Sequence, residues 1–350
     1  MHLRKIAYNR YVKCISTATV IFACGLQPLF AQTADTAVNS VEIRARELWR
    51  GAMSKNEPST EGCFHAAYPN LVWDSVRCTV GVPLAHPTPR TLAAGSPAVV
   101  GNGHDWALGA TGLITAVLGE FLNVKNVKSE KGVGVASFGG GGILGPNEYT
   151  LQLNSNDNAT TSACAGHSGC TVWQQYLYAT DVLGKGKAGV FIQYWLLNWG
   201  TAACPHGYID AGTSCFKNSA AVAAPDTKIT DLGKLQLEGT AVAGGNDMVF
   251  FSNGTNVYSV KTNDSVLNLG LVWTQAEFNV VGNAGGSRAN FNTGASFDVV
   301  LGVEDGSAAA PHCLLNKGTT GETNNLNLGT CITARGSSTG SPGMAFFEGR

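Results

Sequence analysis

The 350-residue sequence predicts an all-β fold, an antiparallel sandwich of two sheets with disulfide-stapled loops. Only 13% of the residues are charged and 44 are glycine, a composition typical of extracellular β proteins with many turns. From Ala98 onward, apolar segments of strand length alternate with clusters of Gly, Asn, Asp and Ser. An even number of cysteines follows the N-terminal segment, which indicates disulfides in an exported protein.

Residues 1–31 are predicted to be a secretory signal peptide. Basic residues precede a mostly apolar run from Cys14 to Leu26, and small residues follow near Ala31. This run is too short to anchor the chain across a bilayer, so we expect cleavage after Ala31 and a secreted or periplasmic protein without membrane contact. A lipoprotein cut before Cys24 is the alternative. The basic residues are Arg4, Lys5, Arg10 and Lys13.

Residues 32–60 are predicted to be an N-terminal extension that contains one helix, from Val41 to Met53. The helical spacing of the apolar residues favours it, because they fall on one face. The helix is interpreted either as a propeptide or as a structural helix packed on the sheet. In a propeptide, Arg44, Arg46 and Arg50 would pair with carboxylates of a groove. The apolar face consists of Val41, Ala45, Leu48 and Trp49.

Residues 61–350 are predicted to form one β-sandwich domain of the concanavalin A-like or jelly-roll type, with a barrel as the alternative. Little periodicity is found between Glu61 and Arg90, and Gly139 to Gly142 are interpreted as a loop rather than a phosphate cradle. The expected strands are Trp106 to Val117, Gly132 to Phe138, Tyr149 to Asn154, Leu235 to Val242, Met248 to Ser252, Val257 to Lys261 and Ser296 to Val303.

The eight cysteines of this domain are expected to pair as neighbours, because each pair brackets a turn-rich stretch. Eight cysteines allow about 105 pairings, so this connectivity is a preference among many. A metal site is the rival interpretation, but the sequence holds no CxxC or HExxH motif, and no metal or cofactor is expected. The favoured pairs are Cys63–Cys78, Cys164–Cys170, Cys204–Cys215 and Cys313–Cys331.

Three aromatic segments, at residues 170–180, 190–200 and 271–282, carry amides or an acid on one predicted strand face. This polar face predicts the floor of a groove. Gln174 and Gln175 are expected on opposite faces, so that at most one of them lines the groove. The residues expected to share faces are Trp273, Gln275, Glu277 and Asn279 in the last segment, and Gln193, Trp195 and Trp199 in the second.

The order of these motifs resembles the glutamic peptidases. Gln175 follows Cys170 on a strand, an aromatic strand comes next, and the segment Gln275 to Phe278 resembles the one that carries the catalytic glutamate of the eqolisins. The strand from Glu148 to Asn154, with the cysteines that follow it, is similar to the neprosin group. The resemblance covers roughly residues 148–281.

This resemblance implies a secreted acid endopeptidase that acts as a monomer on polypeptides. Glu277 would activate water, and Gln175, or Glu148 in the neprosin-like version, would be its catalytic partner. General acid–base help of this kind accelerates reactions by roughly 10²–10⁴-fold. An unperturbed glutamate titrates near ~4.3, which predicts an acidic optimum. The candidate substrate-binding residues are Trp173, Gln193, Trp195, Trp199, Trp273 and Gln275.

Two other functions fit the same polar, aromatic face. A non-catalytic, lectin-like sandwich would stack sugars on Trp173, Trp195 and Trp199. A glycoside hydrolase would use Glu277 with Glu148 or Glu238, two carboxylates about 5–9.5 Å apart.

Nucleic-acid binding is not expected, because the net charge of −1 comes with no basic patch. Asp247 is interpreted as a turn residue and Glu238 as a surface strand residue.

Overall fold

The computed structural model describes residues 29–80, 105–136, 139–316, 323–338 and 340–350, with side chains in the helix from Ser40 onward. Contacts divide the chain into residues up to Arg44 and a compact unit from Ala45 to Arg350. Helix α1 (Leu29–Lys55) runs through this boundary, and its last turns belong with the β-sandwich. The predicted boundary near residue 60 therefore lies later than the one that the contacts give.

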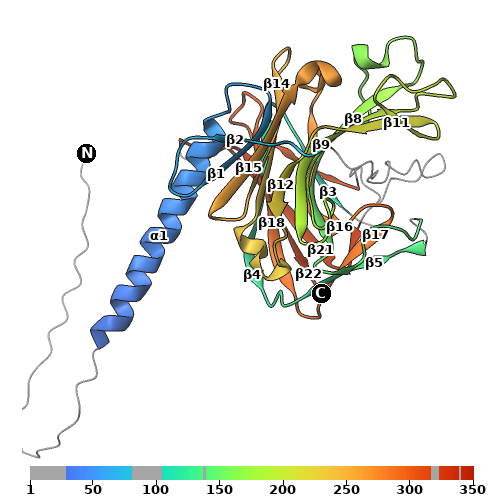
Figure 1. The fold of residues 1–350 in the computed structure, drawn as a ribbon. Helices are drawn as coiled ribbons and strands as arrows, with labels where there is room; N and C mark the ends of the chain where they lie inside the picture. The colour runs from blue at the N-terminus through green and yellow to red at the C-terminus, as the bar shows by residue number, and fades with distance from the viewer. Residues whose placement is uncertain (1–28, 81–104, 137–138, 317–322, 339) are drawn as a thin grey trace, which may run out of the picture. The chain divides into compact units, whose positions relative to one another are not determined.

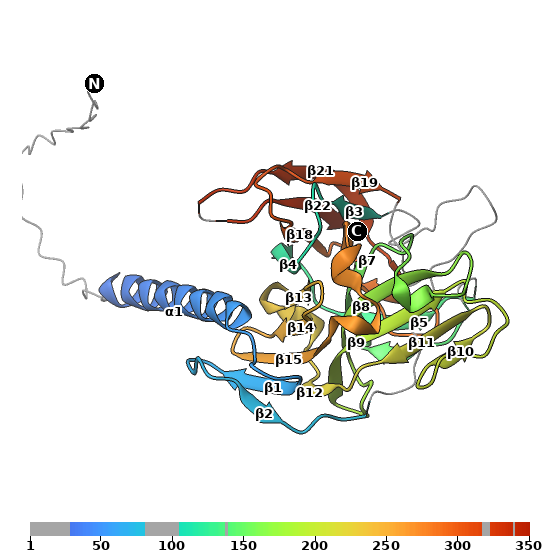
Figure 2. The same cartoon turned by 90° about the horizontal axis from the view of Figure 1, so that it is seen from above.

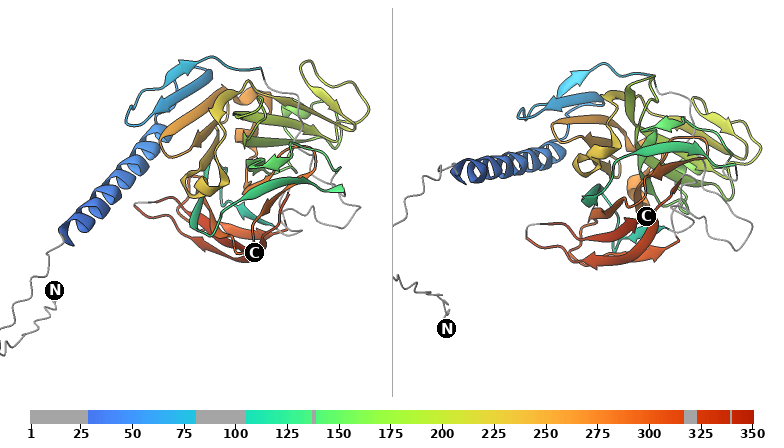
Figure 3. Two further views of the ribbon diagram at one scale, coloured as in Figure 1. Left: turned by 60° about the horizontal axis from the view of Figure 1, so that its bottom comes forward. Right: turned by 90° about the horizontal axis from the view of Figure 1, so that it is seen from below.

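The first large sheet, sheet 1, is antiparallel throughout and has nine strands. Figure 2 shows β1, β15, β14 and β13 following one another, and the red C-terminal strands of Figure 3 complete the other end. Its strands in spatial order are β2 (Asp74–Val76), β1 (Gly62–Ala67), β15 (Asn256–Asn263), β14 (Asn246–Ser252), β13 (Gln236–Ala241), β4 (Ala116–Lys125), β18 (Ser296–Glu304), β22 (Gly343–Gly349) and β21 (Asn327–Ala334).

The second large sheet, sheet 2, packs against sheet 1, and a small sheet 3 lies at its side (Figure 1). Sheet 2 runs β10 (Ile209–Ala211), β11 (Ser214–Asn218), β9 (Lys187–Leu197), β8 (Thr171–Ala179), β7 (Tyr149–Ser155), β16 (Gln275–Gly282), β3 (Trp106–Gly109) and β19 (His312–Leu315), with β12 (Val222–Pro225) also on β9. Sheet 3 contains β20 (Thr323–Asn324), β17 (Ser287–Phe291), β5 (Glu130–Gly134) and β6 (Gly145–Pro146). Short 3-10 helices span Ser162–Cys164, Ile229–Lys234, Asp264–Val266 and Leu269–Leu271.

The predicted all-β, two-sheet sandwich is confirmed, and most of the expected strands are present. The expected strand Trp106 to Val117 is divided between β3 and β4 by a turn. The segment Gly132 to Phe138 contributes to β5, although residues 137–138 lie outside the described residues. Strand β1 was not expected, because its short sequence lacks strict alternation.

The main core lies between the two large sheets, where alternate side chains of both point inward. Phe278 of β16 packs on Phe121 of β4 with ring centroids 5.0 Å apart. Two glycines of sheet 1 let aromatic rings of sheet 2 approach the backbone closely. A Cβ atom at Gly119 would lie 2.3 Å from the Phe278 ring, and one at Gly239 would lie 2.5 Å from the Tyr176 ring.

Replacing Gly119 with alanine is therefore expected to destabilise the fold by about 1–3 kcal/mol, because the Phe278 ring must move in a filled core. Gly302 on neighbouring β18 is the matched control, since nothing lies within 4 Å of a Cβ atom there. Denaturant unfolding of Gly119→Ala and Gly302→Ala measures the difference. Equal stability of the two variants would contradict this account of the core.

The four neighbouring disulfides are all present: Cys63–Cys78, Cys164–Cys170, Cys204–Cys215 and Cys313–Cys331. Four such bonds indicate a non-cytoplasmic environment, because disulfides persist in oxidising compartments. Among the described residues, no helix is long and apolar enough to cross a membrane. The signal peptide predicted at residues 1–31 falls almost entirely outside the described residues, and its last residues begin α1.

Helix α1 ends on the outer face of sheet 1 (Figure 1). Trp49 and Met53 are buried against Ala66, Phe250 and Val257. This confirms Trp49 on the packed face, but the predicted face is otherwise wrong, because Val41 and Leu48 are exposed.

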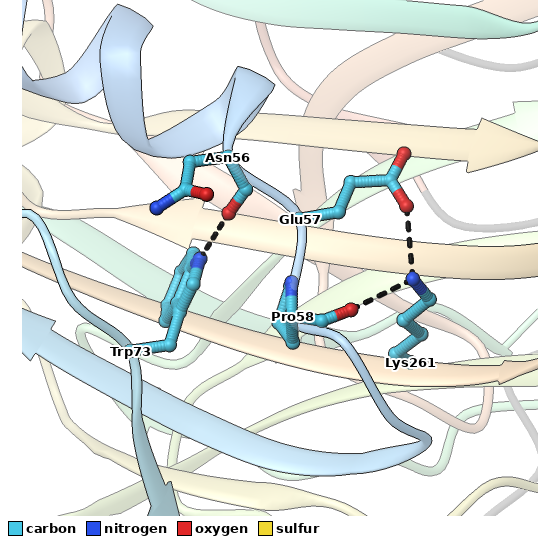
Figure 4. A network of polar contacts seen from close by, with 5 residues as sticks. All are labelled: Asn56, Glu57, Pro58, Trp73 and Lys261. Carbon is cyan, nitrogen blue, oxygen red and sulfur yellow. Dashed lines mark hydrogen bonds and ion pairs between the residues drawn. The ribbon is translucent and has the colours of Figure 1, made fainter.

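The segment that follows the helix is tied to β15 and to the residue before β2 (Figure 4). The Trp73 indole donates to the Asn56 carbonyl, and the Lys261 Nζ lies 3.0 Å from a Glu57 carboxylate oxygen and 2.8 Å from the Pro58 carbonyl. These contacts stabilise the exit of the chain from α1 toward β1.

Candidate functional site

A row of polar side chains crosses five strands of sheet 2 on the face that points away from the main core. Cross-strand partners form the row: Glu277 lies opposite Asn154, Asn154 opposite Gln175, Gln175 opposite Gln193, and Gln193 opposite Asn218. We call these five residues the amide row. Their immediate neighbours in sequence, such as Ala276 and Phe278, point into the core, as the alternation of a strand requires.

Hydrogen bonds connect the amide row along its length. The Asn154 amide donates to the Glu277 carboxylate at 3.2 Å, and the Gln175 amide donates to the Asn154 Oδ1 at 3.1 Å. Gln175 also donates to Gln152 Oε1 at 3.2 Å. At the other end, the Gln193 amide donates to Asn218 Oδ1 at 2.6 Å. The structure thus brings Glu277 and Gln175 to one face, two strands apart, with Asn154 between them.

The strand that carries Glu277 is held in place at its start by Asn156. The Asn156 Oδ1 accepts from the Thr274 amide at 2.9 Å, and its Nδ2 donates to the Val272 carbonyl at 3.2 Å. Asn156 follows directly after β7, so these bonds fix β16 relative to its neighbouring strand. The register that places Glu277 opposite Asn154 follows from this local link.

Four of the five residues of the amide row are buried, and Asn218 at its end is half-buried. Glu277 is 3% exposed, Asn154 1% and Gln175 and Gln193 0%. The predicted solvent-open groove floor is therefore a closed polar layer in this structure. A large groove, with a volume of about 850 Å³, lies instead on the outer face of sheet 1 beside α1.

Two of the candidate tryptophans accompany the amide row. Trp195 is 1% exposed, its indole donates to Gln193 Oε1 at 2.9 Å and to Gln175 Oε1 at 3.2 Å, and its ring stacks on Phe216. Trp173 lies beside Trp195, with ring centroids 6.0 Å apart, and is completely buried. The rings of Trp173 and Trp195 thus pack beside the amide row.

The expected positions of Trp199 and Trp273 are wrong. Strand β9 ends before Asn198, whose positive φ of 53° breaks the alternation, so Trp199 lies beyond the strand and stacks on His167 instead. Trp273 precedes β16 and packs in the main core against Tyr176. Gln275, the first residue of β16, is half-buried and shares the face of Glu277.

Glu148 lies at the far end of β7 from Asn154. Six residues of extended chain separate them, about 20 Å, so the structure does not bring Glu148 to Glu277. Glu148 accepts from the Thr180 hydroxyl at 3.0 Å and from Asn283 Nδ2 at 3.3 Å. Burial, and then a hydrogen bond with Asp181, raises the pKa of Glu148 to about 7. This site is a separate cluster of carboxyl groups.

Glu130 of β5 is a further member of that cluster. Burial, together with the nearby charge of Glu148, raises the pKa of Glu130 to about 9. No side chain among the described residues donates a hydrogen bond to its carboxyl oxygens, whereas backbone groups of Glu148 and Asn290 act in the opposite sense and lower the pKa. The group is therefore a buried neutral acid at physiological pH.

Glu348 of β22 lies beside the Glu277 end of the amide row. It accepts from Asn279 Nδ2 at 2.8 Å and from Asn324 Nδ2 at 3.0 Å. Burial raises its pKa to about 7. Asn279, two residues from Glu277 on β16, thus turns toward this acid rather than into the amide row.

Gln174 points to the opposite face from Gln175, as expected. It donates to Asp247 Oδ2 at 3.0 Å and to the Tyr176 hydroxyl at 2.9 Å inside the core. Asp247 is not a turn residue, because it lies in β14 and is completely buried, and burial raises its pKa.

Glu238 is also not a plain surface residue. It lines the groove beside α1 on sheet 1, and burial raises its pKa to about 7. Glu238 and Glu277 therefore lie on different sheets. The basic residue Arg50 of α1 lines an adjoining pocket that Glu238 also lines, and its guanidinium donates to the Lys234 carbonyl. The predicted pairing of Arg50 with carboxylates near Glu277 is thus not found.

Asn154, Gln152 and Asn218 are the members of the site that the sequence did not single out. A signal for Asn154 was present, because it ends a strand in which Gln152 and Asn154 alternate with leucines. Only the register across β7, β8 and β16 shows that Asn154 faces Glu277. Among the described residues, no group of three or more His, Cys, Asp or Glu side chains has the arrangement of a metal site.

Comparisons with models of protein families, with curated proteins and with solved structures found no match to this chain.

Proposed function

We propose that this protein is a secreted acid endopeptidase of the glutamic type, in which Glu277 activates water for attack on a peptide bond. The observation that supports it is the placement of Glu277 and Gln175 on one face of sheet 2, linked through Asn154 by hydrogen bonds of 3.2 and 3.1 Å. The motif resemblance rests on the same two residues. If the side chains of Glu277 and Gln175 pointed to opposite faces of sheet 2, they could not act on the same substrate.

In the proposed reaction, the Glu277 carboxylate takes a proton from water, and the hydroxide attacks the carbonyl carbon of the scissile bond. A carboxamide of the amide row donates a hydrogen bond to the oxyanion that forms. Such a donor typically contributes about 3–4 kcal/mol. Protonated Glu277 then gives its proton to the leaving amine as the C–N bond breaks. Since Glu277 is 3% exposed, this reaction requires that a substrate gain access to a buried carboxylate.

The two other functions have less support. A sugar-stacking platform needs exposed aromatic faces, whereas Trp173 and Trp195 are buried and Trp199 stacks on His167. The glycosidase interpretation pairs Glu277 with Glu148 or Glu238, and neither of these two carboxylates lies near it. Glu148 lies about 20 Å along the strand, and Glu238 lies on the other sheet.

The test is a digestion assay with casein or hemoglobin over the pH range 2–8. We expect cleavage that is greatest in acid, as the resemblance to the glutamic peptidases implies. Cleavage should resist pepstatin and chelators, since neither an aspartic dyad nor a metal takes part. Activity that pepstatin or a chelator removes would overturn the assignment, and reducing-sugar release from a glycan panel would favour the glycosidase.

A further inference from the structure

The direction of every hydrogen bond in the amide row is set by one residue, Trp195. An indole N–H donates and never accepts. Its two partners, at 2.9 and 3.2 Å, must therefore be the carbonyl oxygens of Gln193 and Gln175. A carboxamide whose oxygen is fixed has its NH2 group fixed as well, so both glutamines have one orientation.

This orientation passes from Gln175 to Glu277. The Gln175 NH2 group faces Gln152 and Asn154, at 3.2 and 3.1 Å, and both must present their oxygens to it. Asn154 then has its own NH2 group on the side of Glu277, where it donates to the carboxylate at 3.2 Å. The chain Trp195–Gln175–Asn154–Glu277 thus consists of donors that all point toward the acid.

The geometry also decides which carboxamide is next to the acid. Directly opposed residues on neighbouring strands have Cβ atoms about 4.5–5.5 Å apart, which applies to Asn154 and Glu277. Gln175 is a further strand away, so its backbone lies about 9.5 Å from that of Glu277. Gln175 therefore acts on Glu277 through Asn154 in the resting structure.

We propose that Trp195 and Asn154 are positioning residues: Trp195 fixes the direction of the chain, and Asn154 holds the Glu277 carboxylate ionised and oriented as the base. This inference rests on the proposed function of Glu277. It gives Trp195 a role different from stacking a substrate. It also makes Asn154 a member of the site that the family resemblance does not include.

The test measures the ionisation of Glu277 itself, by carboxyl ¹³C NMR titration of the full-length protein, with the Glu277 signal assigned by its loss in Glu277→Gln. In Asn154→Leu the carboxylate loses a donor, so its titration midpoint is expected to rise by about 1–2 pH units. In Trp195→Phe the ring stays but both amides are free to flip, and a rise of up to about 1 unit is expected. The ionisable groups on or next to elements packed against β16 include Asp105, which precedes β3, Glu348, which binds Asn279, and Arg288 of β17.

Trp106→Phe is the matched control, because it removes an indole N–H from the same sheet, one that donates to the Gly329 carbonyl and not to the amide row. Its Glu277 midpoint should equal that of the unmodified protein. An unchanged midpoint in both Asn154→Leu and Trp195→Phe overturns the proposal. If Asn154→Leu does not fold, Trp195→Phe decides alone.

The two proposals fail in different ways. Midpoints that shift as expected in a protein without acid proteolysis would refute the peptidase and keep the hydrogen-bond chain. Proteolysis that requires Glu277, with midpoints that do not move, would refute the chain and keep the peptidase.

Discussion

Replacement of Glu277 by glutamine is expected to reduce acid proteolysis by at least about 10²-fold, since general acid–base help contributes roughly 10²–10⁴-fold. Glutamine has the same shape, and its carbonyl oxygen still accepts from Asn154, so the amide row and the fold should persist. What is lost is the ability to take a proton from water and to return it to the leaving amine. The measurement is kcat/KM for a peptide substrate across the acid range.

Glu238→Gln is the control for this variant. Glu238 is also a glutamate in a strand, with a pKa that burial raises to about 7, but it lies on sheet 1. Its replacement should leave kcat/KM unchanged. Thermal unfolding of both variants separates a catalytic effect from a loss of folding. A fully active Glu277→Gln protein would end the glutamic-peptidase proposal, however well the remaining residues are placed.

The fold was predictable from the sequence because two-residue periodicity and turn chemistry are local properties. Alternation predicted that Gln174 and Gln175 lie on opposite faces of the sheet, and this is confirmed. Turn-rich stretches between neighbouring cysteines predicted four correct disulfides. The alternation argument failed at Trp199 and Trp273, where a positive φ at Asn198 and the late start of β16 end the strand geometry.

The composition of the candidate site was less predictable, since it depends on which strands become neighbours. Nothing local shows that β7 lies between β8 and β16, and so nothing local shows that Asn154 separates Gln175 from Glu277. Because the sequence does not show the register between strands, Glu148 was also a candidate partner for Glu277. The burial of single residues was also not predictable. Asp247 has the sequence context of a turn, yet it lies in a strand and is buried in the core.

Buried acids are a general feature of this structure, and most of them have a raised pKa. Burial is the largest cause in each case. It raises the pKa of Glu130 to about 9, of Glu148, Glu238 and Glu348 to about 7, and of Asp226 to about 6, and it raises the pKa of Asp247. Asp181 and Asp305 differ from these acids, because hydrogen bonds lower the pKa of both carboxyl groups.

The protein is therefore expected to be most stable in mild acid and to lose stability as the pH rises toward 9. A carboxyl group with a raised pKa binds its proton more tightly in the folded state. Its contribution is fully present below the unfolded value, near 4.5, and is lost as the pH rises through the folded value. For Glu348, with a folded pKa of about 7, the loss is on the order of 3 kcal/mol. One such group lowers Tm by about 5–10 °C, which calorimetry between pH 4.5 and 9 measures.

The variant Glu130→Met tests whether buried acids cause the loss of stability with rising pH. Methionine fills a similar volume without a carboxyl group, and the only polar partners that it leaves behind are backbone groups of Glu148 and Asn290 among the described residues. The variant should gain stability over the unmodified protein, and gain more at pH 9 than at pH 5, because only at high pH does the fold oppose the ionisation of Glu130. Glu61→Met, at an exposed position, should leave the dependence of stability on pH unchanged. A Tm that rises with pH in the unmodified protein would contradict the whole argument, since it would require acids that ionise more readily in the fold than out of it.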